Sequence, residues 1–226
     1  MALDEPRGYF VTGTDTGVGK TRVALALIHA LRAQGLRVAA MKPVAAGSMP
    51  GELNEDVTAL LQAANVAADI RDVNPYAFIE AVAPHIAAQQ MGVRIEQQVI
   101  VAAYARLATI ADVVVVEGAG GWRVPLNERE DMADLAQALG LPVVLVVGLR
   151  LGCLNHALLT AESIARRCLP WAGWVGNVID PAMPRTEANL DALRARLPVP
   201  CLGVQDFNPA PTAVADTPEW LTLPKN

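Results

Sequence analysis

The sequence predicts an α/β fold, a doubly wound parallel sheet with helices on both faces. Two observations carry this prediction. Short apolar runs alternate with helical patterns along the chain, and the runs at 112–118 and 142–148 are apolar on both faces, as buried parallel strands are. The length of 226 residues suits one domain and no repeat or linker divides the sequence, so we interpret residues 1–226 as a single domain.

Apolar runs mark the expected strands, and helical spacing marks the segments between them. The first strand, GYFVTG, occupies 8–13. Further strands are expected at 36–44, 112–118, 142–148, 171–179 and 198–204. Helices are expected at 20–33, 54–64, 84–91, 95–110, 132–139, 153–167 and 185–196. Because ligands of such folds bind beyond the carboxyl ends of the strands, functional side chains are expected there.

Charge and hydropathy bear on the possible partners. The net charge is −5 and no basic run is present, so neither nucleic acid nor an anionic membrane is expected as a partner. The segment 135–154 is almost wholly apolar and about long enough to span a bilayer. Glycine, proline and arginine interrupt it, at Gly140, Pro142, Gly148, Arg150 and Gly152. These interruptions favour a helix end, a buried strand and a loop over a membrane span.

The cellular compartment is predicted from the amino terminus and the cysteines. The first residues, MALDEPRGYF, carry acids and a proline where a signal peptide needs a basic start and an apolar stretch. The cysteines, Cys153, Cys168 and Cys201, are odd in number and lack CxxC spacing. A disulfide framework or a zinc site is therefore not expected, and a reducing cytoplasm is.

The first strand runs directly into a glycine-rich turn, GTDTGVGKT at 13–21, and a helix follows at once. This is the context of a P-loop, in which backbone N–H groups converge on phosphate oxygens. Lys20 is placed to reach the β- and γ-phosphates of ATP, and the Thr21 hydroxyl to bind Mg²⁺. Five residues separate Gly13 from Gly19 where the standard motif has four, so a glycine-rich turn without nucleotide is the alternative.

Two more charged residues stand at strand ends. Lys42 closes the second strand and would be a second cation near the γ-phosphate; the alternative is an ordinary surface lysine. Glu117 follows four consecutive valines, the Walker-B position that holds Mg²⁺ or its water; the alternative is a solvated acid at a turn. For Asp56, which stands near the start of a predicted helix, the residues alone indicate a helix-terminus role. Asn177 could pair with adenine or be a turn former.

Several longer motifs occur in a characteristic order. They are YFVTGTDTGVGKT, MKPVAAGS, NPYAFIEAVAPH, VEGAGGW, LGCLNHALLTA and GWVGN. In these motifs the chain resembles the dethiobiotin synthetases over roughly 9–203, and the five-residue P-loop spacing is the one that family uses. The resemblance implies an ATP- and Mg²⁺-dependent ligase of biotin synthesis, with a P-loop NTPase-like fold. The enzyme would join diaminopelargonate and CO₂ through a carbamate and a carbamic-phosphoric anhydride, releasing dethiobiotin, ADP and phosphate.

The resemblance also implies roles for individual residues. Lys20 and Lys42 would be catalytic. The nucleotide would be bound by Thr16, Gly17, Val18, Gly19, Lys20, Thr21, Asp56, Glu117, Gly118, Ala119, Gly120 and Asn177. Thr21, Asp56 and Glu117 would manage Mg²⁺. Lys42, Cys153, Leu154 and Asn155 would bind substrate, the last three across the interface of a homodimer with a shared active site.

The chain departs from the family pattern at three places. Gly17 of the P-loop stands where some members of the family have glutamate. Ala46 stands where members of the family have serine, which removes a hydroxyl near the substrate amines. Beyond Gly203 the run VQDFNP differs from the segment expected near adenine. The competing interpretation is a nucleotide switch or partitioning ATPase on the same fold. Such proteins typically carry an additional lysine early in the P-loop, and residues 14–16 contain none.

Overall fold

A six-stranded parallel sheet forms the centre of the computed structural model, which describes residues 8–210 and 218–224. The strands lie in the order β2-β5-β1-β6-β7-β8. Their bounds are β1 Gly8–Gly13, β2 Val38–Met41, β5 Val113–Glu117, β6 Val143–Leu149, β7 Trp171–Val178 and β8 Cys201–Gln205. This order places β1 in the interior of the sheet, with β5 on one side and β6 on the other. The predicted α/β fold class is confirmed.

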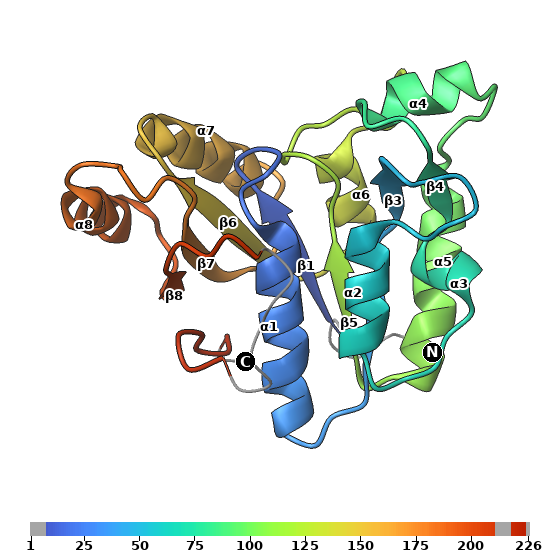
Figure 1. Ribbon diagram of the computed structural model, residues 1–226, viewed down its shortest axis with the longest axis horizontal. Helices are drawn as coiled ribbons and strands as arrows, with labels where there is room; N and C mark the ends of the chain where they lie inside the picture. The colour runs from blue at the N-terminus through green and yellow to red at the C-terminus, as the bar shows by residue number, and fades with distance from the viewer. Residues whose placement is uncertain (1–7, 211–217, 225–226) are drawn as a thin grey trace.

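Helices cover both faces of the sheet (Figure 1). Their bounds are α1 Lys20–Ala33, α2 Glu55–Ala63, α3 Ile70–Val73, α4 Pro84–Gln90, α5 Gln97–Ile110, α6 Met132–Leu139, α7 Cys153–Ala165 and α8 Thr186–Arg196. Neighbouring strand residues point to opposite faces, since Val115 packs in the core under α1 while Val114 and Val116 pack in the other core. The near-continuous valines of β5 and β6 are therefore explained by burial on both sides.

The second predicted strand, 36–44, is shorter than expected. It ends at Met41, and Val44–Ala46 forms a separate strand, β3, paired in parallel with β4 (Tyr76–Phe78). Pro43 has no N–H with which to continue a ladder, and the Lys42 N–H donates to the carbonyl of Val73 (2.8 Å) instead of to the main sheet. The chain thereby leaves the sheet at Lys42. β4 and α3 were not predicted.

The apolar segment 135–154 has the predicted structure. α6 ends at Leu139, Gly140 closes it in the left-handed conformation, and β6 and the start of α7 follow. Among residues 8–210 and 218–224, no helix is both long and apolar enough to cross a membrane. Residues 1–7, part of the segment on which the absence of a signal peptide was argued, lie outside the described residues.

Candidate active site

The P-loop connects β1 to α1 and lies against Asn177. Gly19 precedes α1 in the left-handed conformation, at φ 91°. A Cβ at Gly19 would stand 2.2 Å from the side-chain nitrogen of Asn177, so only glycine fits. Among the described residues no side chain caps α1, which leaves the first N–H groups of the helix available to an anion. The loop therefore has the form of a phosphate cradle.

Lys20, the first residue of α1, is buried beside this cradle. Its ammonium donates a hydrogen bond to the carbonyl of Asp15 (3.1 Å). Burial lowers the pKa of Lys20 to about 8, although the negative charge of Glu117 acts in the opposite direction. The charged ammonium is thus poorly solvated in the free protein, and a bound anion would stabilise it.

Thr21, Lys42, Asp56 and Glu117 converge next to Lys20. The Thr21 hydroxyl oxygen lies 2.8 Å from Asp56 Oδ1 and 2.9 Å from Glu117 Oε1. The Lys42 ammonium donates to Asp56 Oδ2 (2.9 Å) and to Glu117 Oε1. Burial by itself would lower the pKa of Lys42, but the charges of Glu117 and Asp56 outweigh it and raise that pKa. Lys42 is therefore a buried, paired cation and not a surface lysine.

Strand register explains the meeting of Lys42 and Glu117. Met41 of β2 is the neighbour of Val116 in β5, so the next residue of each strand emerges at the same edge of the sheet. Asp56 arrives from the first turn of α2. The side chain of Asn54 caps this helix by accepting from the Asp56 N–H (3.0 Å), so the Asp56 carboxylate is directed to Lys42 and Thr21.

The cluster suits a hard divalent cation. Glu117 is fully buried, and its Oε2 has no hydrogen-bond partner within the described residues, which is unfavourable for a carboxylate oxygen. Within the same residues no group of three or more His, Cys, Asp or Glu side chains could hold a metal by itself. Mg²⁺ typically takes one or two carboxylates and completes its shell with water and phosphate oxygens, so two carboxylates and a hydroxyl are a fitting set.

A cavity of about 570 Å³ opens from the charged cluster. Of the predicted site residues it brings together Thr16, Gly17, Gly19, Lys20, Thr21, Lys42, Asp56, Glu117, Ala119 and Gly120. Much of the remaining wall is apolar and consists of Val44, Ala45, Ala46, Ala81, Val82, Ala83, Pro84 and Val124. The cavity therefore offers charge at one end and an apolar surface at the other, a common design for small-molecule sites.

Other predicted residues lie outside the cavity lining. Val18 and Asn177 contact each other, since the Asn177 amide donates to the Val18 carbonyl (2.9 Å), and Gly118 packs against Phe10. The predicted substrate residues Cys153, Leu154 and Asn155 form the first turn of α7, away from this lining.

Sequence reasoning missed two groups of residues at the site. The apolar wall at 81–84 lies within the motif NPYAFIEAVAPH, which had been noted without a site role. Arg150 had been noted only as an interruption of an apolar segment, yet its guanidinium donates to Asp15 Oδ2 of the P-loop (2.7 Å). No sequence signal links these two residues, which are 135 positions apart.

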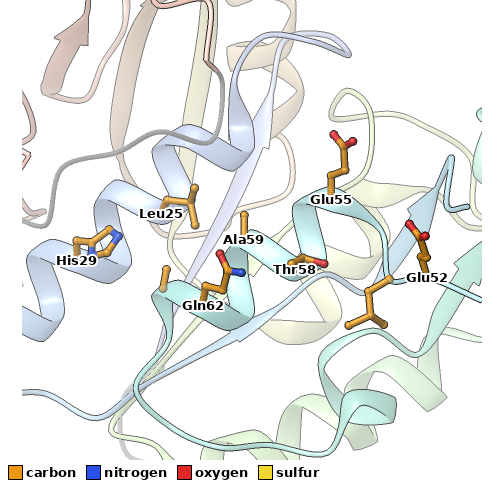
Figure 2. Close-up of a pocket in the computed structure, with 9 residues that line it drawn as sticks. Leu25, His29, Glu52, Glu55, Thr58, Ala59 and Gln62 are labelled. Carbon is orange, nitrogen blue, oxygen red and sulfur yellow. The ribbon is translucent and has the colours of Figure 1, made fainter.

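A second cavity, of about 630 Å³, lies between α1 and α2 (Figure 2). It is lined by Leu25, His29, Glu52, Leu53, Glu55, Thr58, Ala59, Gln62 and Ala63. It contains no glycine-rich loop and no lysine, and its charged side chains are acidic. The groups that could bind phosphate are gathered in the P-loop cavity, which we take as the candidate active site.

Comparisons with known proteins agree with this geometry. A family model described as an AAA domain matches residues 7–214. Two solved structures of the cell-division protein MinD are similar in fold. The septum site-determining protein MinD of Pyrococcus horikoshii, in complex with Mg-ADP, has a TM-score of 0.58 at 17% identity and covers 90% of this chain and 82% of its own. MinD of Aquifex aeolicus has a TM-score of 0.55 at 16% identity and covers 95% of this chain and 88% of its own. At these identities the likeness shows the P-loop fold alone.

Curated relatives are much more similar in sequence. Three proteins named ATP-dependent dethiobiotin synthetase BioD illustrate this. That of Aromatoleum aromaticum is 55% identical, over 89% of this chain and 91% of its own. That of Nitrosospira multiformis is 53% identical over 89% of each chain. That of Pseudomonas aeruginosa is 53% identical over 91% of this chain and 93% of its own. Since such relatives match about nine-tenths of its length, the chain belongs to the ATP-dependent dethiobiotin synthetase family.

Proposed function

We propose that this protein is a dethiobiotin synthetase acting as one P-loop ligase domain. It closes the ureido ring of dethiobiotin from diaminopelargonate and CO₂, and ATP is converted to ADP and phosphate. The observation that carries the proposal is the convergence of Lys20, Lys42, Asp56, Glu117 and Thr21 at one end of a cavity with an apolar wall. The charged end suits a triphosphate and a carbamate, and the apolar wall suits an alkyl chain.

The proposed reaction has three steps. One amine of the substrate attacks the carbon of CO₂ and loses a proton, which gives a carbamate. A carbamate oxygen then attacks the γ-phosphorus of ATP and ADP leaves. Finally the second amine attacks the carbonyl carbon of the mixed anhydride, expels phosphate and loses a proton as the ring closes. Every nucleophile and every leaving group belongs to the substrates, so positioning and charge neutralisation suffice and no side chain need form a covalent bond. Mg²⁺, when bound, would neutralise charge on the β- and γ-phosphate oxygens.

The protein's own groups would divide this work. Lys20, whose ammonium rests on a loop carbonyl in the free protein, would transfer its hydrogen bond to the β- and γ-phosphates. Lys42 would face the carbamate and the γ-phosphate, and Asp56, Glu117 and Thr21 would hold Mg²⁺. Asn177 lies against the P-loop at the end of β7, from where its amide could pair with adenine.

The direct test of the function is mass-spectrometric detection of dethiobiotin from purified protein with diaminopelargonate, bicarbonate, Mg²⁺ and ATP. ADP should form only when both diamine and bicarbonate are present. A nucleotide switch on the same fold would instead release ADP without them, and that result would overturn the proposal.

We further propose that the protein works in a reducing cytoplasm. The three cysteines are free in the described structure, as this compartment requires.

We also propose that two copies of the chain share each active site. Cys153, Leu154 and Asn155 lie outside the cavity of their own chain, so their proposed contact with the substrate carboxylate needs a second copy. Leu151 beside them is 88% exposed, and apolar Val82 at the cavity is 38% exposed. A two-fold contact would bury such residues.

A subunit-mixing experiment tests the shared site. Lys42→Ala and Asn155→Ala, each expected to be nearly inactive as a pure dimer, are mixed and allowed to exchange subunits. A mixed dimer then has one site with both defects and one with neither, so roughly a quarter of wild-type activity should return. Sites that lie within single chains would regain nothing. Native mass spectrometry provides the control by confirming that exchange has occurred.

Ala46→Ser restores the hydroxyl that the family carries at this position. Ala46 lines the cavity, and one good hydrogen bond to a substrate amine is worth ~1 kcal/mol. We expect an unchanged or modestly lower Michaelis constant for the diamine, with the turnover number retained. Ala46→Cys is the matched control, since a thiol bonds weakly. A large rise in the constant for serine would show that the hydroxyl finds no partner here.

A further inference from the structure

Arg150 forms an ion pair with the P-loop although it belongs to a different part of the sheet. It directly follows β6, in the turn that leads to α7, and its Nη2 donates to Asp15 Oδ2 at 2.7 Å. The two side chains are 43% and 46% exposed. Exposed ion pairs of this kind contribute little to stability, so the stability of the fold does not account for the contact.

Asp15 makes three contacts in and around the P-loop, two through its carboxylate and one through its carbonyl. Its Oδ1 accepts from the Thr16 N–H (2.7 Å), which fixes the backbone of the loop just before its second glycine. Its carbonyl accepts from the ammonium of Lys20 (3.1 Å). One carboxylate oxygen therefore shapes the loop, the other binds Arg150, and the carbonyl of the same residue receives the lysine.

The loop after β5 also packs against Asp15. A Cβ placed on Gly121 would lie 3.5 Å from the Asp15 Cα, so the loop after β5 packs closely against this residue. Asp15 thus contacts both the loop after β5, through its backbone, and the guanidinium of Arg150, through its side chain. Any rotation of its side chain away from Arg150 would alter the backbone that holds Lys20 and the phosphate-facing N–H groups.

We propose that Arg150 is a positioning residue for the nucleotide, acting through Asp15. The ion pair holds the P-loop in the form that receives phosphate before the nucleotide arrives, and Arg150 itself need not touch the phosphates. The inference rests on the proposed ATP-dependent function, because it assigns the P-loop to nucleotide binding. Its consequence is that loss of the pair weakens nucleotide binding with little effect on the stability of the fold.

The test measures Mg-ADP affinity by titration calorimetry for Arg150→Met, Asp15→Asn and the double variant. Asp15→Asn keeps an oxygen for the Thr16 N–H and removes the charge that binds Arg150. Each single variant should weaken binding about twofold to fivefold, and the double variant should be no weaker than the singles, because both remove the same contact. Arg150→Lys should recover part of the affinity, and thermal midpoints should stay close to that of the wild type.

A matched control is available on α8. Arg194 pairs with Asp191 at 2.9 Å and is 44% exposed, so Arg194→Met removes an exposed ion pair that does not involve the P-loop. It should leave nucleotide affinity unchanged. Unaltered Mg-ADP binding in Arg150→Met would overturn the inference. So would additive losses in the double variant, which would mean that Arg150 contacts the phosphates directly.

The binding measurement also separates this inference from the proposed reaction. It needs neither diamine nor bicarbonate. A wild type that binds Mg-ADP but forms no dethiobiotin would refute the reaction and leave the comparison of variants valid.

Discussion

Lys42→Met is expected to abolish most turnover and to lower the stability of the fold. The substitution leaves the fully buried Glu117 and the partly exposed Asp56 without their shared cation. Removing one partner of a buried ion pair costs ~3 kcal/mol or more, which for a chain of this length lowers the thermal midpoint by roughly 6–12 °C. Turnover should fall at least ~10²-fold, because the charge that we propose to face the carbamate and the γ-phosphate is lost.

Two further measurements identify the cause of this destabilisation. Added Mg²⁺ should raise the thermal midpoint of Lys42→Met more than that of the wild type, since a divalent cation can neutralise the same two carboxylates. The double variant Lys42→Met, Glu117→Gln removes both buried charges and should recover much of the lost stability, without recovering activity. A single variant as stable as the wild type would contradict the buried ion pair.

Lys20→Ala is expected to reduce turnover about as much as Lys42→Met does. Unlike Lys42→Met, it is not expected to lower the thermal midpoint. The charge that we propose to bind the β- and γ-phosphates is removed, so a loss of turnover of at least ~10²-fold is expected. In the free protein, however, Lys20 bonds only weakly, to a carbonyl, and burial lowers its pKa to about 8 from its usual 10.5. The thermal midpoint of Lys20→Ala should therefore equal or exceed that of the wild type near pH 7.

The lowered pKa of Lys20 predicts how its contribution to folding stability changes with pH. Because the folded-state pKa lies below the unfolded-state value, the buried ammonium destabilises the fold fully below pH 8. Between pH 8 and 10.5 the unfolded state binds more protons, so the contribution of Lys20 to wild-type stability rises with pH. The stability difference between Lys20→Ala and the wild type should shrink across this range, as denaturant titrations can measure. Near-normal turnover by a folded Lys20→Ala enzyme would refute the P-loop assignment.

These contrasting expectations for two lysines could not be obtained from the sequence. Both stand near strand ends at the same edge of the predicted sheet, and the family resemblance assigns both to phosphate and carbamate. Lys42 is paired in the free protein because parallel register brings Glu117 beside it and α2 brings Asp56. Lys20 has no such carboxylate within hydrogen-bond distance in the described structure. Only the fold distinguishes them.

The alternation of apolar runs and helical patterns was sufficient to predict the α/β class, and the glycine-rich turn between strand and helix was sufficient to predict the phosphate site. Both signals are local, since hydrophobic periodicity and glycine conformation are properties of a few neighbouring residues. The predicted strand 36–44 was wrong beyond Met41, because Pro43 and the contact of Lys42 with Val73 compete with the ladder.

Tertiary structure alone decided which distant residues meet at the site. Thr21 and Glu117 are 96 positions apart, and Asp15 and Arg150 are 135 apart. Charges at such separations carry no periodic signal, and their pairing follows from strand order, with β1 between β5 and β6. The sequence by itself therefore determined the class of the fold and predicted a phosphate-binding loop. The arrangement of the sheet determined which side chains serve it, because parallel strands bring their carboxyl ends to one edge whatever their distance along the chain.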